Sequence, residues 1–66
     1  MTIYCGIDWA EGHHDVALAD DSGKPAARLR IDDTLAGYQQ LLELLAEHGD
    51  SEASPIPVAI ETGRGL

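Results

Sequence analysis

The sequence lacks most features that commit a short chain to a special class. Its 66 residues include one cysteine, Cys5, so a disulfide framework or a thiolate metal site is impossible within one chain. No apolar run approaches the roughly 20 residues that span a bilayer, and residues 1–5 have neither the basic nor the apolar region of a signal peptide. We therefore expect no membrane association and a cytoplasmic location.

Basic residues are also scarce. Four stand against twelve acidic residues, which gives a net charge of −8. This balance argues against a surface that grips a phosphate backbone. It lowers a DNA hypothesis only modestly, because a carboxylate-rich metal site is itself acidic and nucleases commonly hold DNA with other segments.

The chain is short for an independent domain. A chain of this length buries only about 60% of its unfolded surface, so its stability would be marginal. It stops just after an apolar strand and a glycine-containing turn, where an α/β chain would normally begin its next helix. We interpret residues 1–66 as the N-terminal part of one larger domain.

Alternating apolar and polar residues predict three strands, over residues 2–8, 14–19 and 26–32. The short connections between them favour an antiparallel meander. Arg28 and Arg30 face outward from the third strand, which we interpret as an edge strand protected by its two arginines.

A helix and a fourth strand complete the pattern. Residues 34–48 have an amphipathic helical period, and we expect its apolar stripe to pack in the core: Leu35, Tyr38, Leu41, Leu42 and Leu45. The apolar run before Glu61 predicts a strand over residues 57–61 that is buried on both faces. A right-handed crossover would make it parallel to the first strand, giving an α/β fold of order β-β-β-α-β.

Asp8 and Glu61 are the candidate functional residues, because each is a carboxylate at the polar end of an apolar run. If the first and fourth strands are parallel neighbours, about 4.8 Å apart, both carboxylates lie at one edge of the sheet. Two such groups can share a hard divalent cation, with Mg²⁺ or Mn²⁺ favoured over Zn²⁺. Spacing alone slightly favours the alternative that both are solvated strand ends.

The sequence motifs around these residues resemble those of a known family. Gly6-Ile7-Asp8-Trp9-Ala10, Asp15 to Asp20 with Gly23, Gly37-Tyr38 and Ala59-Ile60-Glu61-Thr62-Gly63 look like the start of the DEDD transposases of the IS110 insertion-sequence type. Pilin-gene-inverting recombinases are similar. The resemblance covers essentially the whole chain, and its most specific part is the early Gly-Ile-Asp together with the later Glu-Thr-Gly.

The resemblance implies part of a RuvC-like domain with the ribonuclease H fold, acting on DNA with a divalent metal. The first two acidic residues of the family match Asp8 and Glu61, and the remaining two aspartates would lie beyond Leu66. In the family, a second, C-terminal domain carries a serine implicated in strand exchange, and that domain would also lie outside this sequence. Some members are directed by a structured RNA.

The chain departs from its relatives at Trp9-Ala10-Glu11 and at Arg64, where other residues are usual. Trp9 could stack on a base and Arg64 could contact a phosphate. The simpler alternatives are packing of Trp9 in the core or a lid and a solvated charge at Arg64.

Other polar residues are interpreted as structural. His13 and His14 are adjacent on a strand and point to opposite faces, so they cannot both bind one ion, and we interpret them as ordinary polar residues at a strand entry. Glu11 is a reserve ligand candidate near Asp8, although a solvated loop residue is the simpler reading. Asp15 and Asp20 read as strand-end and turn residues.

Three functions compete. The first is the N-terminal part of a transposase catalytic domain, inactive by itself because it holds half of the ligands. The second is the phosphate-binding start of an actin-like sugar kinase, which Glu11 disfavours because it would repel an anion. The third is a non-enzymatic module that self-associates through an uncovered strand edge or sheet face, and a homo-oligomer is expected on the same grounds.

Overall fold

The computed structural model describes residues 2–62. The elements follow in the order β1 (Ile3–Trp9), β2 (His13–Asp20), β3 (Pro25–Asp32), α1 (Leu35–Glu47) and β4 (Val58–Thr62). They form one sheet of order β3-β2-β1-β4, in which β4 is parallel to β1 and the other neighbours are antiparallel. The expected α/β fold and element order are confirmed, whereas the larger domain stays a prediction.

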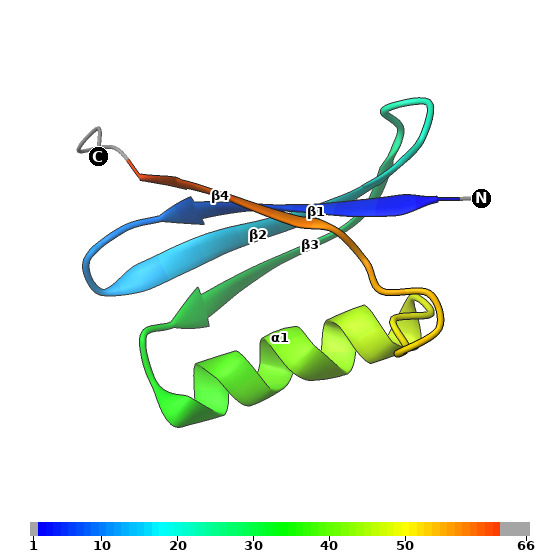
Figure 1. Cartoon of the computed structure of the whole chain (residues 1–66). Coiled ribbons are helices and arrows are strands. Elements are labelled where there is room, and N and C mark those ends of the chain that lie inside the picture. The colour runs from blue at the N-terminus through cyan, green and yellow to red at the C-terminus, as the bar shows by residue number, and fades with distance from the viewer. Residues whose placement is uncertain (1, 63–66) are drawn as a thin grey trace.

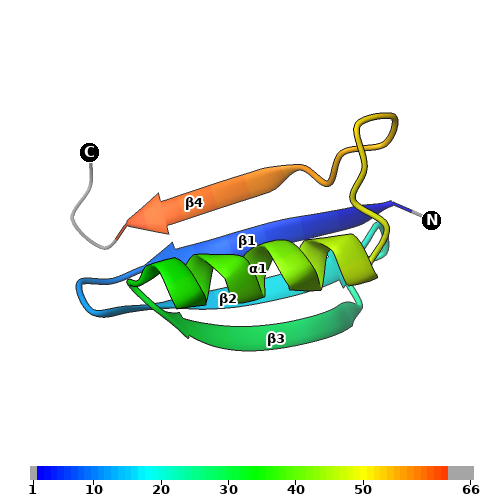
Figure 2. The same cartoon turned by 90° about the horizontal axis from the view of Figure 1, so that it is seen from below.

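The sheet has one face covered by α1 and one face that no described element covers. Figure 1 shows α1 beneath the sheet, and Figure 2 shows it running along β1 and β2, over that part of the sheet, with β4 at one edge. β3 forms the other edge, as the sequence predicts. No helix within residues 2–62 is long and apolar enough to cross a membrane.

The strand period divides the residues between the two faces. Buried residues alternate along β1 and β2, and together with one residue each of β3 and α1 they form the core: Cys5, Ile7, Val16, Leu18, Ile31 and Leu45. Burial raises the pKa of the Cys5 thiol, as expected for an inert core cysteine. The intervening residues form what we call the uncovered face: Gly6, Asp8, Asp15, Ala17, Arg28, Arg30, Ala59 and Glu61.

Local contacts fix where α1 begins and ends. The side chain of Thr34 caps the helix by accepting a hydrogen bond of 3.1 Å from the Gly37 amide. A Cβ atom on Gly37 would lie 2.0 Å from the Asp32 carbonyl oxygen, so only glycine allows this close approach. Gly49, at φ +96°, follows the C-cap in the left-handed region.

Two expectations about burial are wrong. β4 was expected to be buried on both faces, yet Val58 is 46% exposed and Ile60 56%. Leu35 and Leu42, expected in the buried stripe of α1, are 75% and 63% exposed. Both errors have one cause: α1 lies over the middle of the sheet, so no described element packs over the faces of β4 or against the outer flank of the helix.

Candidate metal and nucleic-acid site

Asp8 and Glu61 are direct partners in the parallel pairing of β1 with β4. Each is the second-to-last residue of its strand, and the preceding pair, Ile7 with Ile60, faces the helix side of the sheet. Both carboxylates therefore lie on the uncovered face at the C-terminal ends of two neighbouring strands. The structure brings the two predicted site residues together, and their role as metal ligands stays a prediction.

The cross-strand row that contains this pair extends over all four strands. Asp15 on β2 is opposite Asp8, and Arg30 on β3 is opposite Asp15. The row therefore carries one cation followed by three carboxylates. Asp15 was expected to be a strand-end residue, but it lies within β2 beside the candidate site. The short turn after β1 could have shown this, because residues equally far from a tight turn pair with each other.

Arg30 holds Asp15 through both carboxylate oxygens. Its Nε donates to Oδ1 at 2.8 Å and its Nη2 donates to Oδ2 at 3.2 Å. This hydrogen bonding holds the pKa of Asp15 below its ordinary value, while the same carboxylate raises the pKa of Arg30. Asp15 is therefore negatively charged at neutral pH and already has a partner for each oxygen.

An open depression lies over this part of the uncovered face. Its volume is about 560 Å³, and Asp8, Asp15, Arg28, Arg30 and Glu61 all line it. A second cross-strand row, Arg28 with Ala17, Gly6 and Ala59, forms part of the same lining. A Cβ atom on Gly6 would have no atom within 4 Å, so the floor is free to receive a ligand.

The donor set suits a hard divalent cation only in part. Asp8 and Glu61 provide carboxylate oxygens, the ligands that Mg²⁺ and Mn²⁺ prefer. Within the described residues, however, no group of three or more histidine, cysteine or acidic side chains is arranged to hold a metal ion. Two carboxylates are fewer than a complete site needs, so a metal site that includes further ligands stays a prediction.

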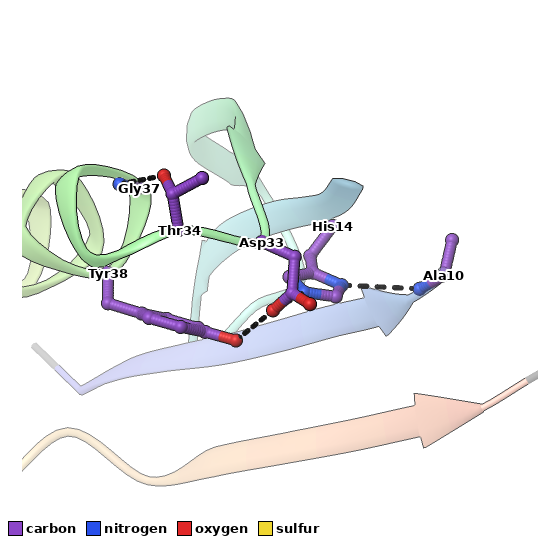
Figure 3. A network of polar contacts seen from close by, with 6 residues as sticks. All are labelled: Ala10, His14, Asp33, Thr34, Gly37 and Tyr38. Carbon is purple, nitrogen blue, oxygen red and sulfur yellow. Dashed lines mark hydrogen bonds and ion pairs between the residues drawn. The ribbon is translucent and has the colours of Figure 1, made fainter. Parts of the chain in front are cut away.

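A polar network lies directly after Asp8 on the helix side of the sheet (Figure 3). His14 is fully buried, and its Nδ1 accepts a hydrogen bond of 3.3 Å from the Ala10 amide. Its Nε2 therefore carries the ring proton and donates to Asp33 Oδ1 at 3.2 Å. The Trp9 ring stacks on the imidazole at 3.6 Å between centroids. The expectation that His14 is an ordinary strand-entry residue is wrong, since it shares the buried face of Val16 and Leu18.

The same network ties the β1–β2 turn to the start of α1. The Tyr38 hydroxyl donates to Asp33 Oδ1, and the Asp33 amide donates to the Gly12 carbonyl at 3.2 Å. The hydrogen bonds from Tyr38 and then His14 hold the pKa of Asp33 below its ordinary value. The turn that follows Asp8 is thus anchored from both of its ends.

Two further residues are predicted to contact nucleic acid, Trp9 and Arg64. The Trp9 ring packs against His14 on the helix side of the sheet, on the face opposite Asp8. The stacking on His14 is the packing contact that we gave as the simpler alternative for Trp9. A contact of Trp9 with nucleic acid stays a prediction. Arg64 lies outside the described residues.

Comparison with known proteins gives a consistent result. A family model described as transposase, of the DEDD IS110 type, matches residues 5–65. A Streptomyces coelicolor protein named as a candidate transposase of the IS117 mini-circle is 67% identical over the whole chain. The chain spans 16% of that relative's length. No solved structure matches the chain.

Proposed function

Since the chain belongs to the IS110 family of DEDD transposases, we propose that it contributes two carboxylates, Asp8 and Glu61, to a metal site for DNA strand cleavage and transfer. The site is of the RuvC type, and the parent enzyme moves an insertion sequence. The observation that carries this proposal is the in-register pairing of Asp8 with Glu61 on one face of the sheet.

Different residues of the chain would have different roles at the site. Asp8 and Glu61 would hold Mg²⁺ or Mn²⁺, which stabilises the entering and leaving oxygens of a phosphoryl transfer. The Asp15 carboxylate lies beside Asp8, but Arg30 offsets its charge, so the attraction for a cation comes mainly from Asp8 and Glu61. The His14 network fixes the turn that follows Asp8 and so orients the end of β1.

Several features of the parent protein extend the proposal. DNA is the substrate, and a structured RNA and a second copy of the chain are further partners. The proposed location is the cytoplasm. Two carboxylates bind a metal weakly, so we expect no DNA cleavage by residues 1–66 alone. The family match favours this function over the start of an actin-like sugar kinase.

Binding of Mn²⁺ to the chain tests the proposal, followed by the loss of the free-ion paramagnetic signal. We expect weak binding that Asp8→Asn and Glu61→Gln each reduce by about tenfold or more, since even the loss of groups that only support ligands costs about that much. Asp21→Asn is the matched control, because it removes one carboxylate from the exposed β2–β3 turn.

Equal Mn²⁺ affinity in all three variants would show that the ion binds to general negative charge, and the proposal would fail. It would fail equally if the unchanged chain bound no Mn²⁺. Circular dichroism of each variant establishes that the sheet is intact before the affinities are compared.

A further inference from the structure

We propose that Arg28 and Arg30 on β3 form a phosphate-binding ledge for the DNA strand whose reacting phosphate lies at Asp8 and Glu61. This inference rests on the proposed function and adds a substrate contact to the same site. Its starting point is placement: both arginines line the depression that Asp8 and Glu61 also line. Two of the four basic residues in a chain of net charge −8 therefore gather beside the candidate metal ligands.

Arg30 is pre-oriented for an anion. Asp15 engages its Nε and one terminal nitrogen. A guanidinium has five N–H donors in a rigid fork, so donors remain for a phosphate oxygen. The pairing with Asp15 also holds the side chain across the sheet in the direction of β1, which lowers the entropy cost of ordering it on binding.

Arg28 is the more available of the two. It is exposed, and no hydrogen bond or ion pair joins it to another group in the described part of the chain. Its partner across the ladder is Ala17, and Gly6 follows on β1, so small side chains separate it from β4. A ligand on this floor meets the Arg28 guanidinium without displacing a protein partner.

The separation between the arginines and the carboxylates favours a polymer over a single small anion. β3 is two strand spacings from β1, or about 10 Å. A ligand that contacts both the arginines of β3 and Glu61 of β4 extends over three strand spacings, which a chain of linked phosphates covers more readily than one small anion. A DNA strand carries one charge on every nucleotide, so a neighbouring phosphate can lie at the arginines while the reacting phosphate lies at Asp8 and Glu61.

The salt dependence of DNA binding tests the ledge. A short fluorescein-labelled single strand is titrated with the chain in EDTA at several salt concentrations, and anisotropy gives each affinity. We expect Arg28→Gln to weaken binding several-fold at low salt and to reduce the slope of log affinity against log salt by about 0.7, the loss of one phosphate contact. Arg30→Gln should act in the same direction, and Arg28→Lys should keep the slope.

Lys24→Gln is the matched control. It removes the same charge from the β2–β3 turn, at the end of the sheet opposite Asp8, and should leave the slope unchanged. The ledge would be overturned by any of three results. The unchanged chain and Arg28→Gln could have the same salt slope, Lys24→Gln could reduce the slope as much as Arg28→Gln does, or the unchanged chain could fail to bind DNA at low salt. EDTA removes the metal, so DNA binding is measured independently of the metal site. If the chain bound no Mn²⁺ but Arg28→Gln still reduced the salt slope, only the proposed metal site would be contradicted.

Discussion

The two faces of the sheet are made by the same strands and have opposite chemistry. Ile7 is 4% exposed in the core, whereas its neighbour Asp8 points to the uncovered face and pairs with Glu61. On the helix side, every buried side-chain polar atom within the described residues has a hydrogen-bond partner. On the uncovered face, Asp8 lies between two other carboxylates, those of Asp15 and Glu61.

The comparison shows that packing for stability and the charged groups of the candidate site lie on opposite faces of one small sheet. Like charges directly opposite each other on a sheet are destabilising. The helix side contains no such conflict and supplies the packing, while the uncovered face accepts an electrostatic cost that suits cation binding. Arg30 offsets part of that cost at Asp15 only. The faces should therefore respond in opposite directions to mutation.

The largest expected effect separates two adjacent histidines. His14→Ala removes a fully buried ring and leaves the Ala10 amide unpaired, so it should lower the free energy of unfolding by about 3 kcal/mol. His13→Ala, on the exposed side of the same strand, should change it by less than about 0.5 kcal/mol. Urea denaturation followed by far-ultraviolet circular dichroism measures both, and equal losses would contradict the assignment of faces.

Two glycines give the next effect. Gly37→Ala improves helix propensity, but its Cβ would clash with the Asp32 carbonyl, so we expect a net loss of about 2 kcal/mol. Gly6→Ala fills open space on the uncovered face and should stabilise the strand by about 0.5 kcal/mol. The same denaturation experiment compares them, and a stabilised Gly37→Ala variant would show that α1 is not held against the end of β3.

The smallest effect has the opposite sign. Asp8→Asn removes the middle one of three neighbouring carboxylates, so in EDTA at low salt it should raise the free energy of unfolding by about 0.5 kcal/mol. Asp21→Asn, in the exposed turn, should leave it unchanged. The gain should shrink as salt is added, since screening weakens the repulsion. A destabilised Asp8→Asn variant would mean that Asp8 serves the fold and would break the comparison between faces.

The sequence predicts the elements and their pairing because their signals are local. Alternation in residues 2–8 and the short turn after them are enough to place Ile7 inward and Asp8 outward. The crossover through one helix then makes β4 parallel to β1, which brings Glu61 beside Asp8. The prediction that this pair binds a metal came from the family motifs, since two acidic strand ends alone are too common to indicate a function.

The features that the sequence did not predict depend on neighbours far along the chain. His14 is buried because Asp33, 19 residues later, accepts its hydrogen bond and Trp9 stacks on it. The exposure of Val58 and Ile60 depends on where α1 lies over the sheet, which an apolar run does not encode. The arginines of β3 looked like edge protection because only the observed register places them beside Asp8 and Glu61.

The strict alternation along β1 also limits how this protein can diverge. An insertion or deletion of one residue between Cys5 and Asp8 would exchange the two faces, sending the carboxylate into the core and Ile7 into solvent. Changes of length can accumulate without that penalty only in the connections between elements, above all in the long segment between α1 and β4. Natural variants should therefore differ in length there while the spacing from Cys5 to Asp8 stays the same.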